Sequence, residues 1–312
     1  MDSIILSLEA VAPIFILMSV GYFIKIIKLA DKSQFDAMNR LVFKVFLPVL
    51  LFYNIYKTDS IDVFEPRYII FTVAGILSVF LAGIPVAMLC TKDNSRRGVM
   101  LQGFFRSNFA ILGVPLVGYI CNGEGGGLTS LMVAVVVPLF NVLAVISLEI
   151  FRGNSINFIK IIKGILKNPL IIGCVIGIIF LFSGIKLPGF AENAIEDISS
   201  IASPLAIVIL GASFTFSSLR GYVKDSLIVV IVKLVISPLI MLTIAAKLGF
   251  TGESLACLLV VFGSPVAVSS FAMSQQMGGD EKLSAQVIVI SSVLCIFTLF
   301  VWIFTFTFMG LM

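Results

Sequence analysis

The stretch FFRSNFAILGVP, residues 104–115, places an arginine, a serine, an asparagine, a glycine and a proline inside a segment that is otherwise apolar enough to span a membrane. A charged side chain at the centre of a bilayer costs about 2.5–3.5 kcal/mol even on the lenient insertion scale. Arg106 lies about eight residues into this segment, hence about 12 Å deep at 1.5 Å per residue, which is too deep to snorkel comfortably. The sequence therefore predicts that Arg106 has a polar partner, a wet cavity or a function.

The composition excludes a soluble globular protein. Of 312 residues, 59% are hydrophobic and only 12% are charged, and no polar stretch is long enough to fold as a separate domain. The chain has no histidine, which excludes imidazole metal ligands and histidine proton relays. Its five cysteines lack paired spacing and are interpreted as small hydrophobic residues. We therefore predict an all-α polytopic membrane protein with no metal, no cofactor and no nucleic-acid partner.

Ten membrane-spanning helices are predicted from the apolar runs. We place them at 4–27, 36–56, 68–90, 98–120, 128–151, 169–184, 194–216, 226–248, 254–277 and 284–310. With the amino terminus outside, the inward loops carry 14 of the 21 lysines and arginines, and the outward loops carry four. By the positive-inside rule, both termini of this multi-pass protein of the cell (inner) membrane are expected to be extracytoplasmic.

The chain divides into two halves of five spans, residues 1–151 and 169–312, joined by a cytoplasmic loop at 152–168. An odd number of spans in each half makes the second half enter the membrane with opposite polarity. An offset of 156 residues places Pro204 on Pro48, Ser264 on Asn108 and Asp280 on Glu124. Inverted repeats with interruptions at matching positions indicate a secondary transporter and point to its binding site.

The fourth and ninth spans are both predicted to be broken. In the ninth span, Ser264 suits the N-cap of a new helix and Pro265 its first position, after a break at Gly263. In the fourth span, Asn108 is the equivalent cap. Two helix N-termini that meet near the midplane would form an anion site. The breaks are assigned to Gly113, Pro115, Gly263, Pro48 and Pro204.

Several polar residues near these breaks have alternative interpretations. Arg106 either caps carbonyls that the break leaves free or meets a substrate carboxylate. Lys233 either snorkels to the cytoplasmic surface or adds positive charge to the cavity. Asn141 suits a hydrogen bond between helices or a substrate contact. The candidate site comprises Asn108, Ser107, Arg106, Ser264, Pro265 and Asn141 as substrate ligands, with Lys233, Ser269 and Gln275 as supporting charge or path.

Four motifs resemble the auxin efflux carrier family of membrane transporters. They are RSNFAILGVPL in the fourth span, FLPVLLF in the second, VPLFN in the fifth and VKLVISP in the eighth. Asn108 and Pro115 match the asparagine and proline of the plant carriers' crossover, and Lys233 matches a basic residue before a proline. The ninth span departs from the plant pattern at Ser264 and Pro265, and the long cytoplasmic loop of the longer plant exporters is absent.

This resemblance implies a fold similar to that of sodium/proton antiporters, with ten helices in two inverted five-helix repeats and with helices 4 and 9 crossing at the site. It implies a homodimer, in which spans one, two, six and seven form a scaffold and the other six move like an elevator. Microbial members are described as permeases for dicarboxylates such as malate or malonate. A small organic anion is therefore the implied substrate.

We accordingly expect a secondary transporter of small mono- or dicarboxylates and no enzymatic activity, because no nucleophile and base occur at useful spacing. The alternative functions are an anion-selective channel and an anion-sensing membrane protein that use the same cavity. Coupling to Na⁺ or H⁺ stays open, as does uniport, because Glu9 and Glu149 lie near span ends.

Overall fold

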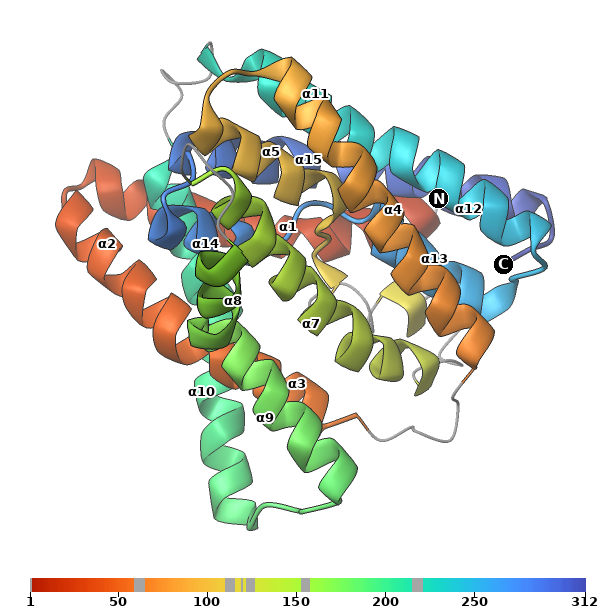
Figure 1. Ribbon diagram of the computed structural model, residues 1–312, viewed down its shortest axis with the longest axis horizontal. Helices are drawn as coiled ribbons and strands as arrows, with labels where there is room; N and C mark the ends of the chain where they lie inside the picture. Colours follow the sequence, from red (N-terminus) through yellow and green to blue (C-terminus); the bar gives the residue numbers. More distant parts are fainter. Residues whose placement is uncertain are drawn as a thin grey trace.

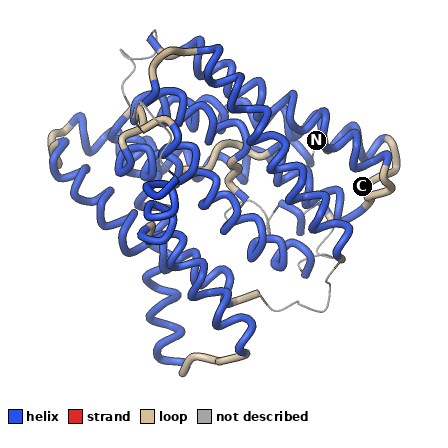
Figure 2. Tube along the Cα trace, in the orientation of Figure 1, coloured by secondary structure: helices blue, strands red, loops and turns tan. Residues whose placement is uncertain are grey.

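The chain folds into a bundle of helices. The computed structural model describes residues 2–58, 65–109, 116–118, 120–121, 127–152, 158–214 and 221–312, with the backbone alone for 2–11, 158 and 160 (Figure 1). Within these residues, Figure 2 shows helices and loops and no strand. Extended pairing there is limited to one isolated bridge between Ser107 and Val266. The first half comprises α1 (Asp2–Ile26), α2 (Lys32–Leu41), the π-helical turn η1 (Val42–Phe46), α3 (Leu47–Tyr56), α4 (Pro66–Cys90), α5 (Asn94–Phe105) and α7 (Gly127–Ile150).

The second half begins with a short helix inside the predicted loop at 152–168. The remaining elements are α8 (Phe158–Lys167), α9 (Pro169–Ser183), α10 (Gly189–Ser213), α11 (Val223–Ile231), the π-helical turn η3 (Val232–Ile236), α12 (Ser237–Lys247), α13 (Gly252–Gly263), α14 (Ser269–Met277) and α15 (Glu281–Phe308). Figure 1 shows one end of α9 and one end of α10 extending away from the rest of the bundle, and α3 packs against both helices.

Several helices are long and apolar enough to cross a membrane. Among the described residues there are five, or six if α8 and α9, which meet at an angle of 61°, are taken as one span. They are α4, α7, α10, the continuous helix Val223–Lys247 and α15. The prediction of an all-α, multi-pass membrane protein is therefore confirmed. The count of ten spans and their division into inverted repeats stay predictions.

Close backbone contact joins α1 to α10. A Cβ atom added to Gly21 would overlap the Val208 carbonyl group, and one added to Gly211 would overlap the backbone of Met18. Each helix thus presents a glycine to the backbone of the other, as small residues do where membrane helices approach closely. On the neighbouring side, α3 packs along both α9 and α10. These four helices form one group, to which the long α15 also attaches through α1.

Replacing Gly211 with valine will destabilise the protein by about 3 kcal/mol, because the added side chain has no space against the α1 backbone. Thermal unfolding of the detergent-purified protein measures this effect. Gly189→Val is the matched control, since Gly189 lies at the start of the same helix with open space around its Cβ position. Equal melting temperatures for the two variants would show that the α1–α10 contact is loose.

Two of the predicted helix breaks are wrong. Pro204 lies inside α10, which runs without interruption from Gly189 to Ser213. Pro48 lies in the first turn of α3, which follows η1 directly, so the helix changes from π-helical to α-helical geometry there without a gap. A proline in a membrane helix is tolerated when local π-helical adjustment or neighbouring groups satisfy the freed carbonyls. Gly113 and Pro115 lie outside the described residues.

Candidate functional site

Two extended segments cross where α5 and α13 end. Arg106 has φ −75° and ψ 115°, and Ser264 has φ −76° and ψ 160°, so each stops its helix in extended geometry. Beyond these residues the two segments run antiparallel, with Ser107 bridged to Val266. The Asn108 N–H donates to the Pro265 carbonyl at 2.9 Å. Irregular backbone survives at this depth only where protein or a cavity surrounds it, and this segment is buried throughout.

The predicted caps in the ninth span are wrong. Ser264 is the C-cap of α13, because its N–H still bonds to the Val260 carbonyl at 3.3 Å. Helix α14 begins at Ser269, with Val268 as its N-cap, so Pro265 lies in the extended segment and is not the first residue of a helix. Gly263 is the last residue of α13. The backbone is thus extended for several residues between the two half-helices.

Lys233 lies between the ends of the two broken helices. Its ammonium donates to the Val261 and Phe262 carbonyls of α13 at 3.2 Å each and to the Phe105 carbonyl of α5 at 3.4 Å. The last carbonyls of a helix lack intrahelical partners and carry the negative end of its dipole. The side chain is fully buried, so the snorkelling interpretation of Lys233 is wrong. One cation therefore satisfies both interrupted helices.

Arg106 is buried without a counter-ion among the described residues. Its side chain is 3% exposed, and its guanidinium donates to Asn141 Oδ1 at 2.8 Å, Ser269 Oγ at 2.9 Å and Met273 Sδ at 2.7 Å. All three partners are neutral. A buried charge is costly unless an opposite charge and hydrogen bonds compensate it. No carbonyl bond is found for its side chain in the described part of the chain, so the capping alternative for Arg106 is not supported, and Lys233 bonds to the helix-end carbonyls instead.

A small cavity opens beside Arg106. It holds about 40 Å³, room for about three water-sized groups. It is lined by Leu47, Leu50, Leu51, Arg106, Ser107, Asn108, Val137, Phe140, Asn141, Leu170, Ser203, Ala206, Ala267, Val268 and Ser269. The first residues of α14 are part of this wall, and they add the positive end of a helix dipole. Among the described residues, the lining contains one cation and no carboxylate.

Two polar atoms of the crossing segment lack partners. Asn108 Nδ2 and Ser107 Oγ are buried and make no hydrogen bond to any described residue. A buried donor without a partner costs about 1–3 kcal/mol. Together with Arg106, these atoms offer donors on one wall of the cavity. A hydrogen-bond acceptor bound in the cavity would satisfy them.

The crossing region brings together most of the predicted site residues. Arg106, Ser107, Asn108, Asn141 and Ser269 all line the cavity. Ser264 Oγ is buried without a partner among the described residues, and Ser264 is not one of the residues that line the cavity. Asn141 also donates from Nδ2 to the Val137 carbonyl at 2.9 Å, so its amide both supports its own helix and orients Arg106.

Gln275 lies away from the cavity. Its Nε2 donates to Asp36 Oδ1 at 2.8 Å and to Glu281 Oε2 at 2.9 Å, and its Oε1 accepts from Asn39. Lys32 pairs with Glu281 at 3.3 Å. These bonds join α2 to α14 and α15. Gln275 is not one of the residues that line the cavity, so the expectation that it lines the substrate path is not supported there.

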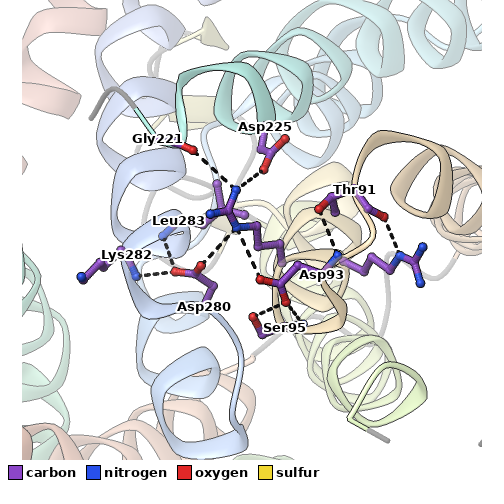
Figure 3. A network of polar contacts seen from close by, with 10 residues as sticks. Thr91, Asp93, Ser95, Gly221, Asp225, Asp280, Lys282 and Leu283 are labelled. Atoms are coloured by element: carbon purple, nitrogen blue, oxygen red, sulfur yellow. Dashed lines mark hydrogen bonds and ion pairs between the residues drawn. The ribbon is translucent and has the colours of Figure 1, made fainter. Parts of the chain in front are cut away.

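A second polar network holds the start of α5, about 18 Å of helix away from the crossing. Arg96 pairs with Asp225 of α11 and with Asp280, the N-cap of α15. Figure 3 shows Asp93, Asp225 and Asp280 gathered in this network. The nitrogen–oxygen distances are 3.1 Å to Asp225, 3.5 Å to Asp280 and 3.6 Å to Asp93. Hydrogen bonds from Ser95 lower the pKa of the Asp93 carboxyl group. The network ties α5, α11 and α15 together at one end.

The sequence motifs did not identify Met273, which contacts Arg106 at the site, or Arg96, which holds the far end of α5. Met273 contacts Arg106 one helical turn after Ser269, a spacing of four that places both on one side of α14. Arg96 carried no signal beyond its place in an inward loop, because its partners Asp225 and Asp280 lie more than a hundred residues away in the chain. A search for small or sulfur-containing residues at spacing four from Ser269 would have found Met273.

The described helices and the buried, positively charged crossing define an integral membrane protein with an internal polar site. The sequence matches the family described as membrane transport protein over residues 6–303, so the chain belongs to this family of transporters. The resemblance to the auxin efflux carrier family is thereby confirmed.

Two archaeal relatives extend the match over nearly the whole chain. An uncharacterized transporter of Methanocaldococcus jannaschii is 27% identical over 310 residues, which cover 95% of this chain and 97% of the relative. An uncharacterized transporter of Methanothermobacter thermautotrophicus (strain Delta H) is 24% identical over 300 residues, with the same coverage of each chain. Both relatives are named as transporters, without a substrate.

Proposed function

We propose that this transporter carries small organic anions, mono- or dicarboxylates, across the cell membrane. The observation that supports this most is the buried Arg106 guanidinium. Its partners among the described residues are all neutral, and the described lining of the neighbouring cavity contains no carboxylate. A carboxylate bound there accepts hydrogen bonds from Arg106, Asn108 Nδ2 and Ser107 Oγ, and it compensates the buried charge. The first turn of α14 adds the positive end of a helix dipole, which stabilises a bound anion.

The proposed architecture is ten spans in two inverted repeats of five, residues 1–151 and 169–312. Matching lengths support it: α5 and α13, which precede the two breaks, have 12 residues each, and α4 and Val223–Lys247 have 25 each. Broken segments at corresponding positions are typical of secondary transporters whose substrate binds near the midplane. The cation distribution supports extracytoplasmic termini.

The proposed mechanism is an elevator movement. The group formed by α1, α3, α9 and α10 is the scaffold, which we assign to a homodimer interface. The unit that moves contains the crossing and is stiffened by Lys233 at one level and Arg96 at another. The cavity takes about three water-sized groups, so the scaffold side of its wall, Leu47 to Leu51 and Ala206, must move away for a dicarboxylate to enter.

Uptake by proteoliposomes tests this function. Radiolabelled mono- and dicarboxylates are offered with and without Na⁺ and pH gradients, and at least one is expected to accumulate saturably. The gradients decide between uniport and coupled transport. Currents far above a carrier's turnover would instead indicate an anion channel, and binding without flux would indicate a sensor. Transport of neutral or cationic solutes alone would contradict the proposal.

Asn108→Ala is expected to reduce carboxylate uptake roughly 10- to 150-fold, the effect of losing a hydrogen bond of about 1.5–3 kcal/mol to a charged group. Because Asn108 Nδ2 has no partner among the described residues, its removal should not lower the melting temperature. Asn54→Ala, a change of the same size in α3 outside the cavity lining, is the control. Uptake by N108A equal to that of N54A would remove Asn108 from the site.

A further inference from the structure

Helix α8 presents three different sides. Its inner side packs on α7: Ile161 is buried, and a Cβ atom on Gly164 would lie 3.4 Å from Glu149 Cγ. Glu149 pairs with Arg152 at 2.9 Å, which holds that carboxylate beneath α8. This side is therefore part of the folded protein.

The outer side of α8 is apolar and uncovered. Ile159 is 77% exposed, Ile162 57% and Leu166 70%, and their spacing of three and four residues places them on one side of the helix. Lys163 and Lys167, four residues apart, are also exposed and follow Ile162 and Leu166 directly in the sequence. Three apolar side chains thus form a strip that is bordered by two lysines.

The direction of α8 places this strip along the surface of the bilayer, so α8 does not span it. Its 10 residues span about 15 Å, and at 61° to α9 the helix advances only about 7 Å along the direction of α9. The 15 residues of α9 span about 22 Å of a hydrocarbon core that is about 30 Å thick. With α9 as a span, α8 lies at the level where acyl chains give way to headgroups.

We propose that α8 is an in-plane membrane helix that binds anionic phospholipid headgroups of the inward-facing leaflet. Ile159, Ile162 and Leu166 enter the acyl region, and Lys163 and Lys167 contact the phosphates. An exposed apolar strip beside lysines is the pattern of helices that lie in a membrane interface. Charge complementarity selects anionic lipids over zwitterionic ones, at about 1 kcal/mol per lysine near the surface. The proposal concerns a surface outside the anion site and does not depend on the transported substrate.

The position of α8 gives this contact a structural consequence. The helix connects α7 to α9, the last helix of the first half to the first span of the second half. Lipid headgroups that hold α8 therefore hold the start of α9 at a fixed depth in the membrane. Because α9 packs along α3, the scaffold group is then anchored to one leaflet.

Tryptophan fluorescence of the full chain in vesicles tests the depth of α8. Trp302 is the only tryptophan in the sequence, so Trp302→Phe gives a protein without tryptophan fluorescence. In that background, the tryptophan of Ile162→Trp is expected to be quenched more strongly by phospholipids brominated near the headgroup end of the acyl chain than by those brominated near its middle. Ser33→Trp, at the exposed start of α2, is the water-facing control. Quenching of I162W no stronger than that of S33W would overturn the in-plane assignment.

Headgroup preference is measured by energy transfer from the same I162W tryptophan to pyrene-labelled phosphatidylglycerol and phosphatidylcholine. The preference for phosphatidylglycerol is expected to fall roughly 10- to 30-fold in Lys163→Gln/Lys167→Gln. Lys186→Gln/Lys247→Gln, an equal change of charge in the predicted outward loops, should leave it unaltered. An unchanged preference for phosphatidylglycerol in Lys163→Gln/Lys167→Gln would overturn headgroup binding, even if the quenching result supports the in-plane position. Carboxylate uptake is expected to be unaffected in either case.

Discussion

Arg106→Gln will reduce carboxylate uptake by proteoliposomes roughly 30-fold to several thousand-fold. The change removes the one cation among the described residues of the cavity lining and leaves a bound carboxylate without that charged partner, a loss of about 2–5 kcal/mol. Glutamine still reaches toward Asn141, so the effect reports on charge more than on packing. Arg106→Lys keeps the charge and loses the planar arrangement of guanidinium donors. Its carboxylate uptake is expected to lie between that of R106Q and that of the wild type.

The control for this prediction is Arg40→Gln, an exposed arginine in the last turn of α2. Both proteins should elute as single species from a sizing column in detergent. If R106Q folds poorly, R106K still tests the prediction, because it preserves the buried charge. Full uptake by R106Q would contradict the assignment of Arg106 to the anion site.

Lys233→Met will destabilise the protein by about 3 kcal/mol or more, because the Phe105, Val261 and Phe262 carbonyls lose their shared cationic donor. Methionine fills a similar volume, so the loss reflects the unpaired carbonyls and the uncompensated ends of α5 and α13. Thermal unfolding in detergent measures it, and uptake should fall as well because the two broken helices carry the anion site.

The matched change is Lys224→Met, which removes an exposed lysine from the first turn of α11. It is expected to leave the melting temperature within the error of the wild-type value, since exposed charges contribute little. Equal melting temperatures for K233M and K224M would show that the crossing does not depend on Lys233.

The break in the ninth span was predictable because its local chemistry is strong. Glycine, serine and proline in succession at 263–265 weaken any helix, and α13 does end at Gly263. The same argument failed at Pro204, where α10 continues unbroken. A single proline removes one backbone bond, which neighbouring groups in a bundle can satisfy, so tertiary packing decides whether the helix stops.

The sequence interpretation left two roles open for Arg106 and two for Lys233 for a similar reason. Depth along a span can be counted from the sequence, but the side of the helix that faces a particular carbonyl cannot. Lys233 follows directly on the π-helical start at Val232, which alters the register of the helix. Only the assembled bundle therefore shows that Lys233 points at the two helix ends and Arg106 at the cavity.

Equilibrium binding of radiolabelled mono- and dicarboxylates to the purified protein, measured by scintillation proximity, tests the central claim most directly. Saturable binding of at least one carboxylate is expected for the wild type, weakened at least roughly 30-fold in R106Q and unchanged in R40Q. Carboxylate binding of equal strength in all three proteins would contradict an anion site between the crossed helices.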